Sequence, residues 1–320
     1  MYNILHKYKR FIFLLIKLAV VIGAFYFIFQ QLDTNELLSF TQLKQQFFIL
    51  FSKNSWLLLI LLLFTDANWL LEIFKWKTLT SNEKEITFYE AYEQCFASLT
   101  ASLMTPNRIG EYGVKAIYFE KNLRKKIMVL NLIGNLSQLV VTLFFGIFGM
   151  FFLSFYVDVE MFSFNLPRFF LILSVLLLFY LIGKNLGITK KLAALIYKIL
   201  SYYKQLPLKI HLKTLAYSLF RYLIFSHQFY FFLRLFDIEA AYFMLMSLIF
   251  STYFIASVIP GLAIFDWVIK GSVAVFIFGF IDVNPLTIVT ITTFMWLLNF
   301  AIPAILGSIF VLNFKMVTEK

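Results

Sequence analysis

Long apolar runs alternate along the chain with short polar and basic segments, and six of the runs are candidates for membrane-spanning helices. They cover residues 12–30, 56–74, 127–153, 169–183, 214–235 and 287–312. A helix of roughly 20 apolar residues matches the hydrocarbon thickness of a bilayer. The pattern therefore predicts an all-α polytopic membrane protein with one transmembrane domain, 1–320, in which the helix at 12–30 is a retained N-terminal anchor.

Two more apolar regions, 88–120 and 240–282, are each too long for one helix, and each is interrupted near its middle by a proline and polar residues. The distribution of Lys and Arg indicates how they cross the membrane. Basic residues gather in 1–10, 75–84, 115–126, 184–213 and 315–320. The segments around Asp237 and Asp282 are acidic instead.

Cytoplasmic loops of membrane proteins are enriched in Lys and Arg, so the basic segments and both termini are predicted to lie on the cytoplasmic side of the membrane. Region 88–120 then begins and ends on that side, and region 240–282 begins and ends on the other. Each is therefore predicted to enter the membrane and return, as a re-entrant loop or as a pair of close-packed helices. Non-helical backbone at such a turn needs cover from protein or a water-filled cavity.

The two interrupted regions match each other without gaps when residue 101 is laid over residue 256. The identical pairs are Ala101 with Ala256, Ser102 with Ser257, Ile109 with Ile264 and Lys115 with Lys270. The flanking apolar runs follow the same order, which predicts one repeat over about 56–153 and a second over about 214–312. An odd helix between them reverses the second copy, so the repeat is predicted to be inverted, as in many transporters.

The first broken hairpin carries polar residues that predict a helix start inside the membrane. Thr105 can cap a helix, and Pro106 suits its first position. Arg108 is expected in the first turn, where the positive end of the helix dipole repels it, so a bound anion would explain its placement. Gly110 and Gly113 lack side chains, which lets another backbone or a lipid head group come close.

Charged residues recur at helical spacing in both hairpins. Arg108, Glu111 and Lys115 share one helix face, and both Glu111–Lys115 and Asp266–Lys270 are carboxylate-to-lysine pairs at i, i+4. Such charges are costly inside a bilayer unless they have partners or a wet cavity. One interpretation is that they bind substrate, and the other is that the pairs only neutralise each other and fix the hairpins. The substrate-binding candidates are Thr105, Asn107, Arg108, Glu111, Lys115, Asp266 and Lys270.

Polar residues on the other helices are expected to have structural roles. Glu72 is predicted to pair with Lys75 or Lys77, and Arg221 is predicted to extend toward the inner membrane surface. His227 is predicted to be a packed, hydrogen-bonded histidine. A further stripe is expected to make interhelical hydrogen bonds, and its members are Asn131, Asn135 and Gln138.

Composition supports the membrane assignment, because 61% of the residues are hydrophobic and only 14% are charged. The net charge of +11 is scattered through loops, so it indicates contact with anionic lipid and excludes a compact nucleic-acid-binding domain. Cys95 is the only cysteine, which excludes an intramolecular disulfide. Catalytic, nucleotide-binding and metal-site motifs are missing, so we expect no enzyme activity, no cofactor and no metal.

The segment TPNRIGE at 105–111 resembles the first signature of the lysylphosphatidylglycerol synthase transmembrane-region family. This is the flippase-like membrane domain of the multiple peptide resistance factor, which also occurs without the synthase domain. The matching residues are Thr105, Pro106, Arg108, Gly110 and Glu111, whereas Asn107 stands where the family usually has Gly. The synthase half is not found here, so the resemblance does not imply aminoacyl transfer to lipid.

The family's second, Gly-rich signature corresponds loosely to Pro260, Gly261 and Asp266, with Asp in place of the usual Glu. Together, the proline-broken hairpins and the resemblance predict a translocase of a bacterial inner membrane for a phospholipid or polyprenyl-linked lipid, whose phosphate is held near Arg108. The alternative is an accessory protein that binds a lipid carrier for a partner glycosyltransferase or lipid-modifying enzyme without moving it. A less favoured third alternative is an intramembrane transferase or hydrolase that uses Glu111 and Asp266 as acid and base.

Overall fold

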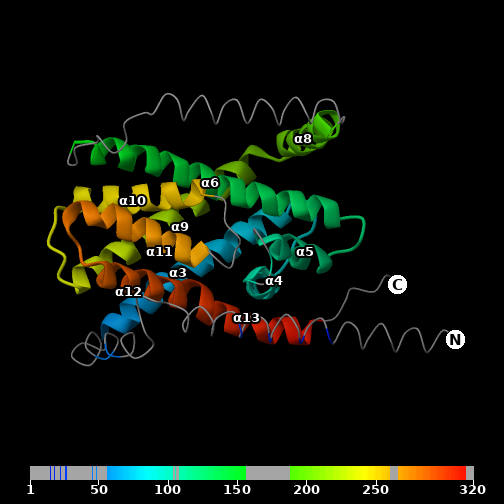
Figure 1. Cartoon of the computed structure of the whole chain (residues 1–320). Coiled ribbons are helices and arrows are strands. Elements are labelled where there is room, and N and C mark those ends of the chain that lie inside the picture. The colour runs from blue at the N-terminus through cyan, green and yellow to red at the C-terminus, as the bar shows by residue number, and fades with distance from the viewer. Residues whose placement is uncertain are drawn as a thin grey trace.

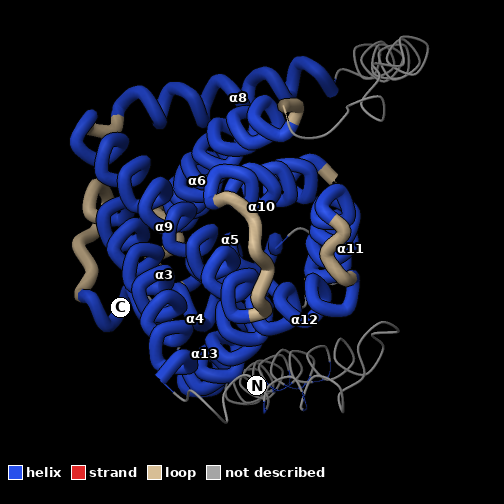
Figure 2. Tube along the Cα trace, turned by 90° about the vertical axis from the view of Figure 1, so that its left-hand side faces the viewer, coloured by secondary structure: helices blue, strands red, loops and turns tan. Residues whose placement is uncertain are grey.

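A computed structural model describes residues 56–103, 105, 108–155, 188–259 and 266–314, and six single positions before residue 50. The side chains of 188–192, 195 and 266 lie outside this description. All regular structure in the described part is helical (Figures 1 and 2). The expected helix at 169–183 and most of the expected anchor at 12–30 lie outside the described residues.

Figure 1 shows the described helices in chain order. In the first half they are α3 (Trp56–Thr80), α4 (Phe88–Leu103), α5 (Ile109–Ile117) and α6 (Arg124–Leu153). The amphipathic α8 (Ile188–Gln205) precedes the second half. There they are α9 (Leu208–Leu235), α10 (Tyr242–Val258), α11 (Asp266–Phe278), η4 (Gly279–Ile281), α12 (Pro285–Trp296), η5 (Leu297–Ala301) and α13 (Ile302–Asn313).

Three described helices are long and apolar enough to cross a membrane: α3, α6, and the continuous helix from α12 to α13. These match three of the predicted spans, and the chain is a membrane protein. α9 is 28 residues long but does not reach the same combination of hydropathy and low charge. Some of its polar residues are buried inside the protein, among them Ser218 and Gln228, whereas Lys209, Lys213 and Arg234 are exposed.

Both interrupted regions form pairs of helices, as the broken pattern predicts. α4 packs against α5, and α10 packs against α11. With 9 residues, α5 is about 14 Å long, which is too short to cross a hydrocarbon core of about 30 Å. Gly110 permits the close packing of the first pair, because a Cβ there would lie 2.6 Å from the carbonyl oxygen of Ala101.

The bundle is built around three long-range helix pairs: α3 with α9, α6 with α10, and α4 with α13. Glycines bring two of these pairs into close contact. A Cβ on Gly149 of α6 would lie 2.9 Å from the Ser247 carbonyl oxygen on α10. A Cβ on Gly307 of α13 would lie 2.2 Å from the Phe96 carbonyl oxygen on α4. Backbone contact of this kind is typical of helices that associate in membranes.

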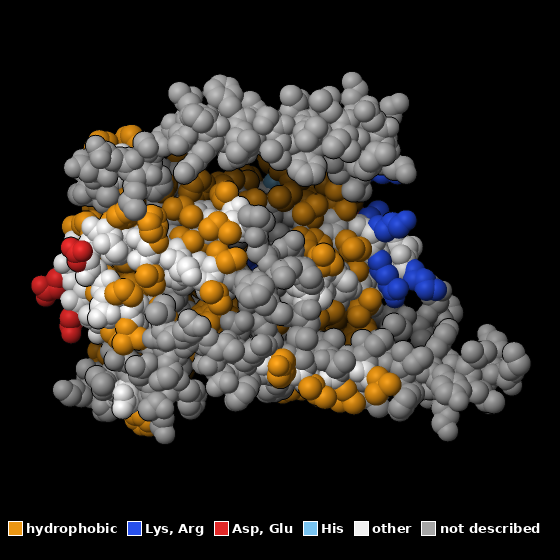
Figure 3. Space-filling model, viewed as in Figure 1, with side chains coloured by type: hydrophobic (Ala, Val, Ile, Leu, Met, Phe, Trp, Pro, Cys, Tyr) orange, Lys and Arg blue, Asp and Glu red, His pale blue; other side chains and the backbone are white. Residues whose placement is uncertain are grey.

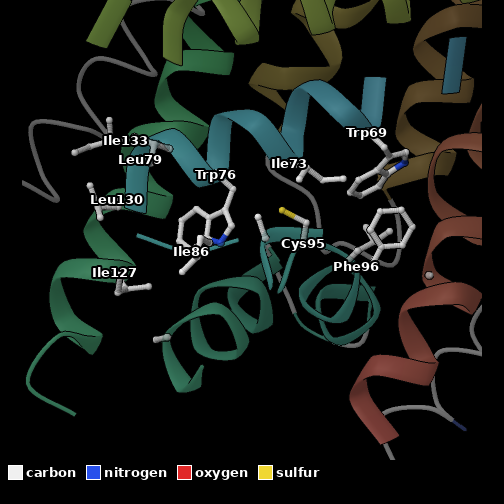
Figure 4. Packing of buried hydrophobic residues seen from close by; sticks show 14 of the residues in the cluster. Trp69, Ile73, Trp76, Leu79, Ile86, Cys95, Phe96, Ile127, Leu130 and Ile133 are labelled. Carbon is white, nitrogen blue, oxygen red and sulfur yellow. The ribbon is translucent and has the colours of Figure 1, made fainter. Parts of the chain in front are cut away.

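A buried apolar cluster joins α3 to α4 and α6 (Figure 4). Trp76 of α3 is 1% exposed, and its indole N–H donates to Gln94 Oε1 on α4 at 2.7 Å. Trp69 packs its ring 4.8 Å from that of Phe96. These contacts fix the face of α3 that carries the charged residues of the site.

The outer surface has the charge distribution of a protein that lies across a membrane. Figure 3 shows Lys and Arg side chains at one end, Asp and Glu at the other, and hydrophobic side chains between them. On α6, the side chains of Phe144, Ile147 and Phe151 are all more than half exposed. An apolar surface of this extent indicates that lipid covers it.

Candidate functional site

A cavity of about 600 Å³ lies where the two helix pairs α4–α5 and α10–α11 approach α3, α6 and α9. Its volume is in the range of small-molecule sites. The charged residues that line it, within the described part of the chain, are Glu72, Lys75, Arg108, Glu111, Lys115, Arg221 and Lys270. They come from α3, α5, α9 and α11, so both halves of the chain contribute.

Lys115 is the centre of the α5 cluster. It is 2% exposed, and its Nζ lies 2.9 Å from Glu111 Oε1 and 2.8 Å from Asn131 Oδ1. The ammonium also lies 4.4 Å from the centroid of the Trp76 ring, where the negative face of the indole stabilises it. The predicted shared face is confirmed, because Arg108 also contacts Glu111, at 3.3 Å.

Glu72 connects this cluster to α3 and α9. Its carboxylate pairs with Lys75 at 2.7 Å, approaches Lys115 to 3.8 Å and accepts a hydrogen bond from Arg221. The predicted Glu72–Lys75 pair is therefore confirmed. The prediction that Arg221 extends to the inner membrane surface is wrong, because its guanidinium turns into the cavity and donates to the buried carboxylate of Glu72 on α3.

A chain of hydrogen bonds that starts at Arg221 links the two halves of the protein. Arg221 Nε donates to Asn68 Oδ1 at 3.1 Å, and Asn68 Nδ2 donates to Asn299 Oδ1 at 3.2 Å. Asn299 Nδ2 then donates to Gln228 Oε1 at 2.8 Å, and Gln228 Nε2 donates to Thr65 Oγ1 at 3.0 Å. Beyond the Arg221 guanidinium, every partner in this chain is an amide or a hydroxyl group, so these bonds hold α3, α9 and η5 together without adding further charge.

Asn299 lies in a wide turn of the long α12–α13 helix. Residues Leu297–Ala301 form a π-helical turn, and Pro303 follows it. Pro303 has no N–H to donate to the carbonyl four residues earlier, which is that of Asn299. The indole N–H of Trp69 donates to this carbonyl instead, at 3.2 Å. The interruption therefore turns a backbone acceptor toward α3, at the wall of the cavity.

The start of α5 differs from the prediction. Arg108 is at the N-cap position, one residue before the helix, with φ 56° in the left-handed region. It was expected inside the first turn. Thr105 does cap the helix, since its Oγ1 accepts a hydrogen bond from the Gly110 N–H at 2.8 Å, but α5 begins only at Ile109. The left-handed turn at Arg108 allows the hydroxyl to reach that far along the chain.

Arg108 is the most accessible cation of the cluster. Its side chain is 46% exposed, whereas those of Lys75 and Lys115 are each 2% exposed. Its only described carboxylate contact is Glu111. A ligand that enters the cavity therefore meets Arg108 before it meets the buried lysines.

The second hairpin supplies Lys270 and an aromatic wall. Lys270 Nζ lies 5.4 Å from the centroid of the Phe300 ring. The rings of Trp267 and Trp296 lie with their centroids 5.7 Å apart and are tilted by 43°, and Tyr253 lines the same cavity. The cavity thus has a charged face and an aromatic face, which suits a molecule with polar and apolar parts.

Several predicted site residues lie outside the described positions, or their side chains do. The residues that are not described at all are Pro106, Asn107, Pro260 and Gly261. Asp266 is the first residue of α11, but its side chain is not described. For Gly113 the predicted contact with another backbone is not found, since no described atom lies within 4 Å of a Cβ placed there, and the approach of a lipid head group stays a prediction.

The predicted structural residues agree with the structure. His227 Nδ1 lies 2.7 Å from the Leu223 carbonyl oxygen, and its Nε2 lies 2.8 Å from the Tyr242 hydroxyl. The stripe on α6 makes the predicted interhelical hydrogen bonds. Asn131 accepts from Lys115, Asn135 donates to the Tyr112 hydroxyl, and Gln138 donates to the Ser218 carbonyl oxygen. The described residues contain no group of three or more His, Cys, Asp or Glu that could hold a metal ion.

A model of the lysylphosphatidylglycerol synthase transmembrane region matches residues 14–307 of the chain. The chain belongs to this family. The match covers both helix hairpins and all charged residues of the cavity, so it agrees with the resemblance at 105–111. The family assigns the chain to membrane domains with a lipid-related function. No curated protein and no solved structure matches the chain.

Proposed function

We propose that this member of the family translocates a lipid or lipid-linked intermediate, whose anionic head group binds in the cavity. One observation carries the proposal: cationic side chains from both halves of the chain line one cavity inside the membrane domain. Guanidinium and ammonium groups bind phosphate strongly, and ionised groups are rare inside membrane proteins unless they serve a substrate. The proposal assigns binding and movement to the protein and no covalent step.

Arg108 is proposed as the first contact of the lipid phosphate. Half of its side chain is accessible, and its guanidinium can form two parallel hydrogen bonds with phosphate oxygens. Lys115 and Lys270 line the cavity beyond it, one on each hairpin. Glu111 pairs with Arg108 and Lys115, and Glu72 approaches Lys115. The aromatic wall would contact the apolar part of the lipid.

An inverted repeat would provide the movement. If α4 and α6 correspond to α10 and α12–α13, the packing of α6 on α10 and that of α13 on α4 are the same contact in two copies. Both contacts are made through glycines. Figure 1 shows the α5–α6 and α9–α10 connections at opposite ends of the bundle, and we propose that the basic end is cytoplasmic. Rocking of one repeat against the other would then open the cavity to each side in turn.

Reconstituted vesicles test this function. The protein is inserted into vesicles that contain a trace of a fluorescent anionic lipid, and the label in the outer leaflet is reduced chemically. We expect the wild type to expose the inner-leaflet label, and Arg108→Ala to do so much more slowly at the same protein density. Binding of lipid without any exchange between leaflets would instead support the accessory, carrier-binding function.

A further inference from the structure

We infer that α8 binds the surface of an anionic lipid leaflet at the basic end of the bundle, as a lipid-binding surface separate from the cavity. No described residue of α8 lines the cavity. The lipid that α8 binds stays in its place in the leaflet and is not the lipid that the cavity would move. The two surfaces can therefore act, and be tested, independently of each other.

α8 lies across the bundle rather than along it. Figure 1 shows α6 extended across the picture and α8 foreshortened beside the end of α6 that leads to α5. Figure 2, turned by 90°, shows α8 extended across the view. Lys and Arg side chains gather at the same end of the molecule in Figure 3. An amphipathic helix that crosses the spanning helices at their basic end has the orientation of a helix that lies in the membrane surface.

One side of α8 is fixed to the protein. The Tyr202 hydroxyl donates to Glu83 Oε1 at 2.8 Å, and Lys126 at the start of α6 donates to Glu83 Oε2 at 2.8 Å. Leu206, the residue that follows α8, is 4% exposed and belongs to the buried cluster of α3, α4 and α6. These contacts determine which sides of α8 face outward.

A second side of α8 is apolar and exposed. Ile196, Leu200 and Tyr203 are spaced i, i+4 and i+7, so they share one face of the helix. Their exposed fractions are 47%, 51% and 42%. Aliphatic side chains on such a face enter the boundary between head groups and acyl chains, and tyrosine is enriched at that depth. The exposed apolar face therefore fits a lipid surface.

The remaining side of α8 is cationic, and its charge selects the kind of lipid. Lys198 is exposed and lies two residues from both Ile196 and Leu200, which places it about 200° around the helix from each. Lys204 in the last turn is also exposed, and neither lysine pairs with a carboxylate in the described part of the chain.

The sequence of α8 contains four lysines and no Asp or Glu. Lysines beside a membrane surface favour anionic over neutral head groups. In a symmetric contact with a second copy of the chain, the lysines of two α8 helices would repel each other instead. The charge and the apolar face together therefore favour an anionic leaflet over a second copy.

The experiment measures which lipid lies beside α8 in the full-length chain. Leu200→Cys is labelled with a fluorophore, and the native Cys95 stays unlabelled because it is 2% exposed. The labelled protein is placed in nanodiscs of phosphatidylcholine that contain the same fraction of either brominated phosphatidylglycerol or brominated phosphatidylcholine. Bromine quenches the label only at close range. We expect the anionic lipid to be about fivefold more concentrated at the label than the neutral one, which is the value of one lysine near an anionic surface.

Charge variants in the labelled protein test the cause of this preference. Lys198→Gln with Lys204→Gln should bring the ratio of the two lipids toward one, whereas Lys198→Arg with Lys204→Arg should keep it. Lys125→Gln, on the exposed start of α6, should leave the ratio unchanged. A label at Ile196→Cys, on the same face as Leu200, gives a second reading if the first variant does not fold.

Three results would overturn the assignment. Equal quenching by the two brominated lipids in the wild-type background would show that α8 does not select anionic lipid. Quenching by iodide in the water, without quenching by either lipid, would show that this face of α8 lies in water. Protection of the label from iodide and from both lipids would show that protein covers the face. None of these results bears on lipid in the cavity, so the proposed function would stand or fall separately.

Discussion

The carboxylate of Glu72 on α3 accepts a hydrogen bond from the guanidinium of Arg221 on α9, which joins the two halves of the chain by an ion pair inside the membrane domain. Three cations depend on this one carboxylate. The charged residues of the cavity therefore hold α3 and α9 together and also form a candidate binding site, and these two roles can be separated by mutation.

Glu72→Gln should destabilise the protein. It leaves Lys75, Lys115 and Arg221 without their shared carboxylate, and removal of one partner from a buried ionic group costs about 3–5 kcal/mol. The measurement is thermal unfolding in detergent, with Glu239→Gln on an exposed loop as the matched control. Added anionic lipid should recover part of the loss, because binding to the folded state stabilises it. An unchanged unfolding temperature would show that the pairs around Glu72 do not hold α3 to α9.

Arg108→Gly should retain stability and lose lipid binding. Arg108 has φ 56°, a conformation that costs a non-glycine residue about 1–2 kcal/mol, so glycine offsets the lost ion pair with Glu111. We expect an unfolding free energy within about 1 kcal/mol of the wild type, while affinity for anionic lipid falls at least about tenfold. Arg108→Val, which cannot adopt this φ easily, should be destabilised as well as binding-deficient. Unchanged affinity of Arg108→Gly for anionic lipid would show that Arg108 does not bind the head group.

Gly307→Ala and Gly113→Ala should have opposite effects. A Cβ on Gly307 would lie 2.2 Å from the Phe96 carbonyl oxygen and would push α13 away from α4. It would also strain the hydrogen bond of 2.7 Å from Thr100 Oγ1 to the Ala304 carbonyl, and we expect a loss of about 1–3 kcal/mol. Gly113 has open space around it within the described structure, so alanine should stabilise α5 by about 0.5–1 kcal/mol. Unfolding of both variants is compared with the wild type, and equal stability would contradict the close α4–α13 contact.

Glu83 should make stability depend on pH at the basic end of the bundle. Partial burial raises the pKa of its carboxyl, but hydrogen bonds from Lys126 and Tyr202 outweigh this and hold the pKa below its ordinary value of 4.5. A lowered pKa contributes stability above the unfolded-state value, and the contribution is lost as the pH falls through the folded-state value. Glu83→Gln should therefore unfold at a lower temperature than the wild type at pH 7.

The same comparison at lower pH provides the control for Glu83. The difference between wild type and Glu83→Gln should shrink as the pH falls below about 4.5, where the carboxylate takes up its proton. A difference that stays constant from pH 7 to acid conditions would show that the carboxylate charge does not carry the contact with α6 and α8.

The hairpins and half of the site could be predicted because their information is local. Arg108, Glu111 and Lys115 are within eight positions of each other, and helical spacing alone puts them on one face. Glu72 and Arg221 are 149 positions apart, and only tertiary packing brings them together. A carboxylate in the middle of an apolar run was the available signal for Glu72, but its partners on α5 and α9 could not be read from the sequence.

The left-handed turn at Arg108 was missed for a different reason. A Thr–Pro pair suggests that a helix starts at once, whereas here the chain makes a further turn before α5 begins at Ile109. Likewise, the π-helical turn at Asn299 depends on a donor from Trp69, 230 positions away. Local preference sets where a helix can start or widen, and distant side chains decide whether it does.

The most direct measurement for the central claim is the identity of the lipid that the purified protein retains. Lipids extracted from the wild type, from Arg108→Gly and from Lys125→Gln are quantified by mass spectrometry against the membrane from which each protein came. The cavity predicts that lipids with an anionic head group are enriched on the wild type and on Lys125→Gln, and that the enrichment is lost on Arg108→Gly. Lipid profiles that match the surrounding membrane in all three proteins would contradict an anionic head-group site between the hairpins.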